Sequence, residues 1–461
     1  MDILGVDIGG TFTDFVLLRD GRLLIHKILS TPDDPARALL EGVATLGAPA
    51  ALVHGTTVAT NALLERRGAP TALITTAGFG DVLAIGRGDR PALYDLDVTR
   101  PAPLVPDRWR IELSERTLYT GEILRPVDRA ELDRIVAWLA SEPVEAVAIC
   151  LLHAYANPVH EQAVVDALNV QTFERSNVQR FFVSASHRVL PEAREYERSS
   201  TTVVNAYVGP ALDRYLGNLG SALGERGVGS LRIMASDGGS MGLATARELP
   251  ARATLSGPAA GVVGARFVAR SAGFERLITF DMGGTSTDVA LCDGALPSSG
   301  ESHVGGLPVR LPSLDIHTVG AGGGSLARID AGGALRVGPA SAGADPGPAC
   351  YGRGSEPTVT DANVLLGRLQ PDYFLGGRMA LDLDRARAAF LPLAQALFPD
   401  AREDTRRHAK IGEDTPFASL GVPSRVEQAA LGVVRVANAA MERAIRAVSV
   451  ERGDDPRDYT L

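Results

Sequence analysis

Cysteine is scarce in this 461-residue sequence, and its three residues lie far apart. Cys150, Cys292 and Cys350 form no Cys-x-x-Cys pair and show none of the spacings typical of a metal site. An odd number of widely spaced cysteines is typical of proteins from a reducing compartment. The cysteines therefore argue against a metal centre and favour a reducing compartment.

Long apolar runs and basic clusters are also missing. No apolar stretch reaches the ~18 residues of a membrane span, and the N-terminus passes directly into the strand pattern Ile3–Val6 without a signal peptide. The formal net charge is −9, and no Lys/Arg cluster offsets it, which argues against nucleic-acid binding. We therefore expect a cytoplasmic protein that binds neither membranes nor nucleic acid.

Glycine, in contrast, is abundant: the chain holds 50, about 11% of the residues against a usual ~7%. The surplus lies in turns such as 320–324 and 343–354, which indicates backbone that closely approaches something. The length allows two or three domains. Alternating strand and helix patterns between 128 and 186 predict an α/β layered architecture.

One stretch of eleven residues occurs twice. Residues 7–17 read Asp-Ile-Gly-Gly-Thr-Phe-Thr-Asp-Phe-Val-Leu, residues 281–291 read Asp-Met-Gly-Gly-Thr-Ser-Thr-Asp-Val-Ala-Leu, and seven of the eleven positions are identical. Each copy follows one short apolar run and precedes another. The repeat therefore predicts two equivalent units of strand, glycine turn and strand.

The chemistry of these turns suggests a phosphate ligand. Paired glycines can adopt positive φ angles that point successive N–H groups into one concavity, which binds anions. The threonine hydroxyls add donors at the rim, and the first aspartate of each copy would repel a phosphate unless Mg²⁺ bridges them. The alternative is a pair of ligand-free hairpins, which two long matching copies disfavour. The residues concerned are Asp7, Gly9, Gly10, Thr11, Thr13, Asp281, Gly283, Gly284, Thr285 and Thr287.

The paired motifs resemble the phosphate-1 and phosphate-2 hairpins of the ATPase superfamily of actin, heat-shock proteins and sugar kinases. Further motifs, from residue 3 to the end of the chain, resemble the hydantoinase A and 5-oxoprolinase family. They are Val-Asp-Ile-Gly-Gly-Thr-Phe-Thr-Asp at 6–14, His-Gly-Thr-Thr-Val-Ala-Thr-Asn at 54–61, Ala-Ser-Asp-Gly-Gly at 235–239, Leu-Ser-Gly-Pro-Ala-Ala-Gly at 255–261 and Gly-Ala-Asp-Pro-Gly-Pro-Ala-Cys-Tyr-Gly at 343–352.

The resemblance implies an α/β fold of two actin-like (RNase H-like) ATPase domains with a nucleotide cleft between them. The first would span 1–255, with an irregular insertion at 78–126, and the second 256–461, with residues 256–271 as the connecting helix. The element that binds adenosine should follow Leu461. We therefore expect the C-terminal portion of the second domain to be incomplete, either because the chain is a fragment or because another polypeptide supplies the rest.

The resemblance also implies ATP and Mg²⁺ as cofactors. Asp7 and Asp281 would be catalytic and would hold Mg²⁺ through its waters, while Asp14 and Asp288 would orient hydroxyls or water. The nucleotide-binding residues would be Gly9, Gly10, Thr11, Thr13, Asp14, Gly283, Gly284, Thr285, Thr287 and Asp288.

The implied activity is that of an ATP-dependent hydrolase subunit. ATP would phosphorylate the amide oxygen of a hydantoin, 5-oxoproline or related lactam, and water would then open the ring. A hydantoinase B-type partner subunit and an oligomer are expected. Two other functions stay open: the ATP-activating subunit of an acetone or acetophenone carboxylase, and a non-catalytic nucleotide-binding scaffold.

Three further patterns have less specific meanings. Asp315 and His317 share a face of a predicted strand, 311–319, and form either an incomplete metal site or, as we favour, a structural pair. Gly322 and Gly323 belong to a glycine-rich loop that could line the cleft but lacks the dinucleotide fingerprint. A long helix is predicted over 195–219, with an interruption near Pro210.

Overall fold

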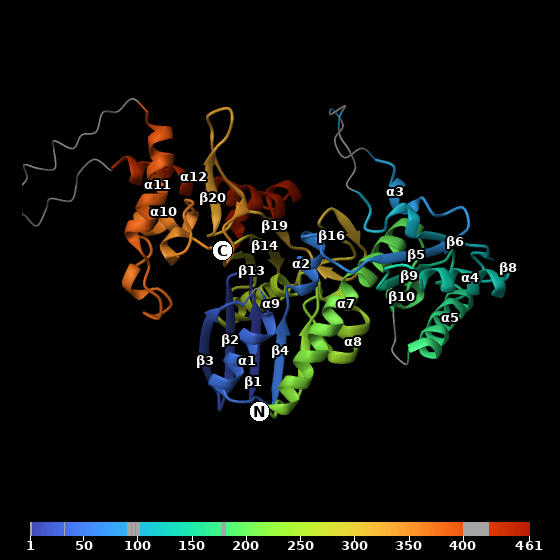
Figure 1. Ribbon diagram of the computed structural model, residues 1–461. Coiled ribbons are helices and arrows are strands. Elements are labelled where there is room, and N and C mark those ends of the chain that lie inside the picture. Colours follow the sequence, from blue (N-terminus) through green and yellow to red (C-terminus); the bar gives the residue numbers. More distant parts are fainter. Residues whose placement is uncertain are drawn as a thin grey trace, which may run out of the picture.

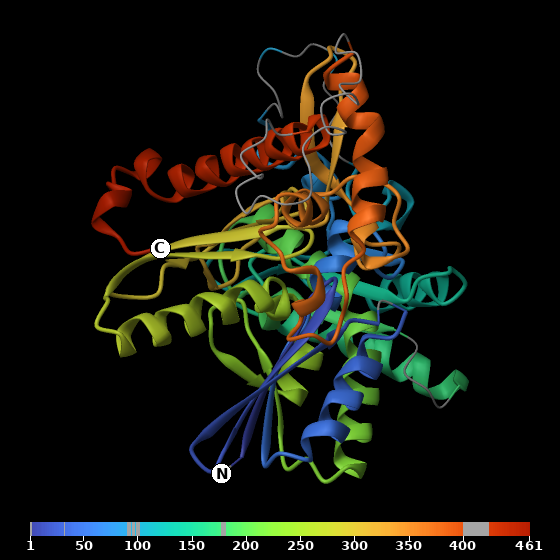
Figure 2. The ribbon, with the colours of Figure 1, turned by 90° about the vertical axis from the view of Figure 1, so that its left-hand side faces the viewer.

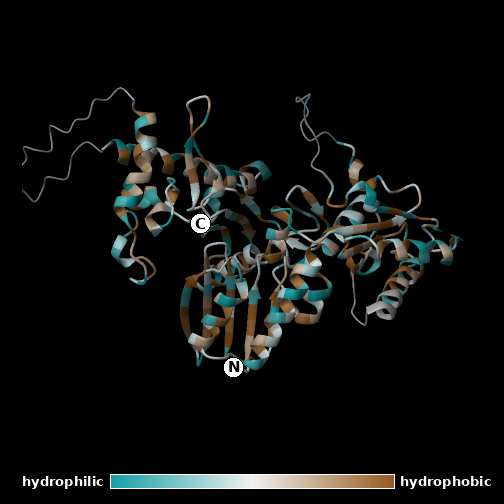
Figure 3. Ribbon diagram, in the orientation of Figure 1, coloured by the Kyte–Doolittle hydropathy of each residue, from teal (hydrophilic) through white to brown (hydrophobic). Residues whose placement is uncertain are grey.

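The computed structural model describes residues 2–31, 33–89, 94, 97, 102–176, 181–399 and 424–461. It is a mixed α/β protein in which a six-stranded, a four-stranded and a three-stranded sheet form the main layers (Figure 1). Hydrophobic residues, which are brown in Figure 3, lie along the strands of the larger sheets. Among the residues in these ranges, no helix is both long and apolar enough to cross a membrane.

The six-stranded sheet carries the first hairpin. Its strand order is β12-β11-β4-β1-β2-β3, with β1 antiparallel to β2 and parallel to β4. Alternate residues of β1, namely Leu4, Val6 and Ile8, are buried against helices α1 and α7, as period-two patterning requires. The strands are β1 (Ile3–Ile8), β2 (Phe12–Arg19), β3 (Arg22–Leu29), β4 (Ala51–Gly55), β11 (Leu231–Met234) and β12 (Ser240–Gly242), and α1 is Pro35–Leu46.

The four-stranded sheet is parallel throughout, in the order β10-β9-β5-β6. β5 and β9 are buried at every residue, which is typical of parallel strands covered on both faces. β6 comes from the segment 78–126, so part of the region expected to be irregular forms a strand of the core. The elements are β5 (Thr71–Thr76), β6 (Arg110–Leu113), β9 (Ala146–Cys150), β10 (Phe182–Ala185), α4 (Arg129–Leu139) and α5 (Val159–Ser176).

Helix α7 (Glu195–Glu225) connects the cores of these two sheets (Figure 1). Val203 and Ala206 pack into the core of the four-stranded sheet, and Leu219 and Leu223 into that of the six-stranded sheet. The interruption expected near Pro210 is wrong, because the helix continues through this proline. Burial along residues 197–209 holds the helix together where local propensity alone would break it.

The three-stranded sheet, β13-β14-β19, carries the second hairpin. Leu277 packs with α9 and the adjacent Ile278 packs with α12, so the two helices cover opposite faces of the sheet. Figure 2 shows α9 between this sheet and the six-stranded sheet. The elements are α9 (Ser256–Ser271), β13 (Arg276–Met282), β14 (Thr287–Asp293), β19 (His317–Val319) and α12 (Arg425–Val448).

The remaining helices and strands are short or peripheral. They are α2 (Val58–Leu64), α3 (Val82–Ile85), α6 (Ser186–Val189), α8 (Leu243–Glu248), α10 (Val359–Leu365), α11 (Leu383–Leu397), β7 (Arg116–Thr117), β8 (Ile123–Arg125), β15 (Ser298–Ser299), β16 (Ser302–Val304), β17 (Leu307–Val309), β18 (Ser313–Leu314), β20 (Ser325–Ile329) and β21 (Leu335–Ser341). The single strand expected over 311–319 is wrong. The segment divides into β18 and β19 because each pairs with a different strand, β15 and β14 respectively.

Candidate functional site

The two repeats form hairpins that match in register and in turn geometry. Asp7 pairs with Asp14 across the first hairpin, and Asp281 pairs with Asp288 across the second. The Gly9 N–H donates to the Phe12 carbonyl at 2.9 Å, and the corresponding bond in the second hairpin has the same length. The predicted unit of strand, glycine turn and strand is therefore present twice.

Close approach of neighbouring atoms restricts two of the four turn glycines, Gly9 and Gly284, and positive φ restricts none of them. None of the four glycines has a φ angle in the left-handed region, so that expectation is wrong. A Cβ on Gly284 would lie 2.5 Å from Thr11 Oγ1, and one on Gly10 would lie 3.7 Å from Thr285 Oγ1. The tips of the two hairpins therefore contact each other, although 274 residues separate them in the sequence.

Helix α9 presents two glycines to the first aspartates of the hairpins. A Cβ on Gly257 would lie 3.1 Å from Asp7 Oδ1, and one on Gly261 would lie 3.3 Å from Asp281 Oδ2. Residues four apart lie on one face of a helix, so one surface of α9 approaches both carboxylates. Gly55 at the end of β4 closes the other side, because its Cβ would lie 2.8 Å from Asp7 Oδ1.

Burial and mutual repulsion raise the pKa values of these aspartates. Burial and then the carboxylates of Asp14, Asp281 and Asp288 raise the pKa of Asp7 to about 6, against a smaller opposing effect of Lys27. Burial also raises the pKa of Asp288 to about 6, although Thr318 donates a hydrogen bond to it. The pKa of Asp281 is raised by burial and by Asp14. Four carboxylates from two distant segments thus share one electrostatic environment.

Lys27 is the cation of this cluster, and sequence reasoning missed it. Its Nζ donates to both carboxylate oxygens of Asp14, at 2.7 and 2.8 Å, and lies 4.9 Å from the centre of the Phe12 ring. The lysine stands opposite Asp14 in the pairing of β2 with β3. A tight turn at Asp20 and Gly21 fixes that register. The position of Lys27 opposite Asp14 could therefore have been read from the sequence of this hairpin.

The threonine hydroxyls of the turns have two different roles. Thr13 Oγ1 is hydrogen-bonded to Ser30 Oγ at 3.0 Å, and Thr287 Oγ1 donates to the Ala321 carbonyl at 2.6 Å. Both of these threonines are fully buried, so they brace the turns. Thr11 and Thr285 are the hydroxyls that lie at the contacting tips.

The glycine-rich loop at 320–324 packs against the turn of the second hairpin and donates hydrogen bonds to it. The Gly323 N–H donates to the Gly283 carbonyl at 2.9 Å, and the Gly324 N–H donates to the Gly284 carbonyl at 2.6 Å. A Cβ on Gly322 would lie 2.8 Å from the Gly284 carbonyl. Packing against the turn therefore accounts for these glycines.

Asp315 and His317 do not gather further ligands. The Asp315 carboxylate pairs with the guanidinium of Arg452, and His317 is exposed on β19. Over the ranges that the structure describes, no group of three His, Cys, Asp or Glu side chains could hold a metal ion directly. Water-mediated binding of Mg²⁺ to the hairpins needs no such group.

The hairpin aspartates fit a hydrated magnesium ion. Asp7 Oδ1 is buried and has no hydrogen-bond partner, which is costly unless a ligand satisfies it. The space beside this oxygen is kept clear by glycines at positions 55 and 257, where a Cβ would intrude. Mg²⁺ prefers carboxylate oxygens and retains several waters.

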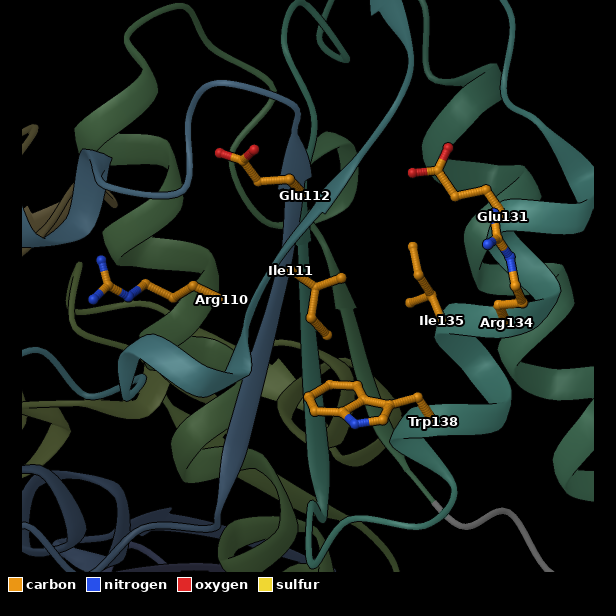
Figure 4. A pocket seen from close by; sticks show the side chains of 7 residues that line it. All are labelled: Arg110, Ile111, Glu112, Glu131, Arg134, Ile135 and Trp138. Carbon is orange, nitrogen blue, oxygen red and sulfur yellow. The ribbon is translucent and has the colours of Figure 1, made fainter.

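A separate groove of about 460 Å³ lies on the four-stranded sheet, between β6 and α4 (Figure 4). It is lined by Arg110, Ile111, Glu112, Glu131, Arg134, Ile135 and Trp138. Figure 4 shows Arg110 and Glu112 pointing away from α4, so the groove is chiefly apolar at its floor. None of its residues belongs to the two hairpins.

The fold and site together define a mixed α/β protein in which a duplicated aspartate and glycine hairpin brings four carboxylates together. The chain belongs to the hydantoinase/oxoprolinase family. The model of the hydantoinase/oxoprolinase domain matches residues 198–461, and that of the hydantoinase/oxoprolinase N-terminal region matches residues 3–171.

Similar proteins include lactam-hydrolysing and carboxylating enzymes. The chain is 40% identical to an uncharacterized protein of Methanocaldococcus jannaschii and 37% identical to caprolactamase subunit alpha of Pseudomonas jessenii. Each comparison covers 99% of this chain, but only 66% and 64% of those relatives. The structure matches that of ATP-dependent caprolactamase from the same bacterium with a TM-score of 0.75 at 36% identity, covering 99% of this chain and 64% of that one. It matches nucleotide-free acetone carboxylase with a TM-score of 0.81 at 29% identity and the same coverage.

Proposed function

We propose that the chain forms two actin-like ATPase domains, residues 1–255 and 256–461, with a nucleotide cleft at the hairpins. The contact between the hairpin tips and the approach of α9 to both aspartates support this arrangement. Contacts cross the proposed boundary elsewhere as well: Val304 and Val309 pack into a core formed by α2 and α7, and the Leu314 N–H donates to the Ser236 carbonyl at 2.7 Å. Such a crossing would couple movement of the second domain to the first.

We propose further that the protein is an ATP-dependent hydrolase that opens a cyclic amide. The observation that carries this proposal is the meeting of four carboxylates from two equivalent hairpins at one glycine-lined place. Phosphoryl transfer depends mainly on positioning and on neutralising charge, which such a site can provide. The likeness to an ATP-dependent caprolactamase supports a lactam as the substrate class.

The residues of the hairpins would have distinct roles. Asp7 and Asp281 would hold Mg²⁺ through water, and the bound ion would neutralise phosphate charge. Backbone N–H groups of the two turns other than those of Gly9 and Gly283, which are bonded within the hairpins, would hold the β- and γ-phosphates. Lys27 is hydrogen-bonded to Asp14 and lies close enough to the cluster to lower the pKa of Asp7. When the nucleotide binds, Lys27 would leave the Asp14 carboxylate and donate to a phosphate oxygen instead.

The chemistry proceeds in three balanced steps. The amide oxygen attacks the γ-phosphorus of ATP, the bond from this phosphorus to the oxygen of the leaving ADP breaks, and the ring carbon becomes more electrophilic. Water then adds to this carbon and the ring C–N bond breaks, which leaves an amine and an acyl phosphate. A second water hydrolyses the acyl phosphate, so inorganic phosphate is released with an amino acid from a lactam or a carbamoyl amino acid from a hydantoin. A hydantoinase B-type partner would complete ring opening, and the name of the alpha subunit of caprolactamase supports a multi-subunit assembly.

Phosphate release tests this function. The protein, alone and with a partner subunit, should release phosphate from Mg·ATP faster when caprolactam, 5-oxoproline or a hydantoin is added. Asp281→Asn should abolish the release, and Asp315→Asn, which alters a half-buried aspartate paired with Arg452, should leave it unchanged. Nucleotide binding without any substrate-stimulated release would instead favour a non-catalytic scaffold.

An ATP-dependent carboxylase subunit is the second candidate, because the acetone carboxylase structure matches over 99% of this chain. In that case phosphate release would depend on bicarbonate and a ketone rather than on a lactam. The same assay with these two co-substrates therefore separates the two enzymes.

A further inference from the structure

One long cation is buried in the N-terminal half without a counter-ion. Arg198, near the start of α7, is only 2% exposed. Its Nη2 donates to the Leu151 carbonyl at 2.8 Å, but its Nε and Nη1 are buried and have no hydrogen-bond partner. Among the side chains that the structure describes, Arg198 alone has two such atoms. A charge that is buried without partners is costly, so this arrangement points to a ligand.

The buried carboxylates of the same region are already engaged. Glu161 accepts hydrogen bonds from Leu151 N, Ser186 Oγ and both the backbone and ring nitrogens of His187, at 2.6–2.9 Å. Glu197 pairs with the guanidinium of Arg87 at 2.9 Å. Neither carboxylate accepts a hydrogen bond from the guanidinium of Arg198, whose Nε and Nη1 stay without a partner.

The position of Arg198 is one where parallel sheets bind ligands. Leu151 directly follows β9, so the guanidinium lies at the carboxyl end of a central strand of the four-stranded sheet. The Tyr155 ring packs on the guanidinium at 5.5 Å, and the Tyr155 hydroxyl is hydrogen-bonded to His153 Nδ1 at 3.1 Å. Tyr155 and His153 are half-buried, so the side chains that flank the buried guanidinium reach the surface.

We propose that Arg198, Tyr155 and His153 form a binding site for a small planar monoanion, namely bicarbonate or the carboxylate of an organic acid. The free N–H groups of Arg198 would donate charge-assisted hydrogen bonds to its oxygens. One buried positive charge balances one negative charge, whereas a phosphate dianion would leave a charge uncompensated. The site belongs to the second sheet, away from the hairpins, and does not rest on the proposed hydrolase function.

Thermal unfolding of the whole chain tests the site without nucleotide. The melting temperature is followed in chloride-free buffer against sodium bicarbonate, acetate and phosphate, with ionic strength held by methanesulfonate. We expect a saturable rise with bicarbonate or acetate and a weaker one with phosphate. A response to bicarbonate alone assigns bicarbonate, and a response to acetate assigns an organic carboxylate.

Two variants and a control give the test its specificity. Arg198→Met should weaken the anion response at least about tenfold, since it removes a charge-assisted hydrogen bond. Arg214→Met, an exposed position on the same helix, should respond as the wild type does. If Arg198→Met does not fold, Tyr155→Phe keeps the ring and should still weaken the response. The absence of any planar-anion response in the wild type, or an equal response in the folded Arg198 or Tyr155 variant, would overturn the proposal.

Discussion

Asp7 combines burial, an unsatisfied oxygen and three neighbouring carboxylates. Neutral water or a protein donor could satisfy the oxygen, but neither would relieve the repulsion among four acidic groups. A hydrated divalent cation relieves both at once. Under the proposed function, binding of magnesium beside Asp7 would therefore stabilise the folded protein.

The raised pKa values predict how stability depends on pH. The pKa values of Asp7 and Asp288 are raised to about 6, so between the ordinary carboxyl range and that value the folded state binds more protons than the unfolded state. The contribution of these two groups to stability should therefore be greatest below the ordinary carboxyl pKa and should be lost as the pH rises through about 6. Asp7→Asn should remove on the order of 1–2 kcal/mol of this fall.

Urea unfolding midpoints, measured across this pH range without magnesium, check the prediction. Asp330→Asn, in an exposed turn, serves as the control because the pKa of Asp330 is lowered by its hydrogen bond with Arg336. A midpoint that depends on pH in the same way in the wild type and in the Asp7→Asn variant would contradict the account.

Lys27 is expected to tune the cluster. Because Lys27 opposes the rise in the pKa of Asp7 and Asp281, Lys27→Met should raise both pKa values further. Because the lysine charge also repels Mg²⁺, the magnesium concentration for half-maximal ATP turnover should decrease at neutral pH, and the decrease should be smaller at acidic pH, where protons compete for the carboxylates. Lys27→Arg keeps the charge and should show a smaller change. Equal magnesium dependence in the wild type and the methionine variant would remove Lys27 from the site.

At the scale of elements, α9 is the part that must fit most closely. Its glycines at 257 and 261 allow the helix to approach both aspartates, whereas Gly264 on the same helix has open space around its Cβ position. Alanine is the better helix former, so the three positions separate helix propensity from close packing.

Gly257→Ala should displace the Asp7 carboxylate and reduce ATP turnover at least about tenfold, because a small misplacement of a positioning group is costly. Gly264→Ala should leave turnover unchanged and stabilise the protein by about 0.5–1 kcal/mol. Steady-state turnover and thermal unfolding on both variants check this. Loss of turnover in the Gly264 variant, or none in the Gly257 variant, would argue against the fit.

The sequence predicted those features that depend on residues close to one another in the chain. The duplicated hairpins follow from an internal repeat, and α12 begins at a capping box of Ser424 and Glu427, a spacing that is visible in the sequence. His54, within the motif at 54–61, is fully buried and hydrogen-bonded to Tyr215 at 2.9 Å. Burial lowers the pKa of His54 to about 4, so it stays neutral.

Features that depend on distant partners were not predictable in this way. The glycines at 284 and 322 are required because backbone or side-chain atoms of other segments lie close to them. The turn glycine at 284 does not have the positive φ angle that the sequence suggested. Pro210 continues a helix because two cores hold it. Arg198 could not be singled out from the sequence, because nothing local marks an arginine as buried.

At the scale of the whole molecule, the site exists only because two halves meet. Each hairpin alone supplies only two aspartates. The contact of Gly284 with Thr11 brings the two pairs of aspartates together. A ligand that bridges the hairpins would therefore also hold the halves together. The predicted domains, the partner subunit, the oligomer and the cytoplasmic location remain expectations at this scale.

Calorimetric titration of the protein with a non-hydrolysable Mg·ATP analogue tests the central claim most directly. If one magnesium-bound triphosphate lies between the hairpins, Asp7→Asn and Asp281→Asn should each weaken binding at least about tenfold, and the double variant should be little worse than either. An analogue that binds the Asp281 variant as tightly as the wild type, while the Asp7 variant loses binding, would contradict a shared site.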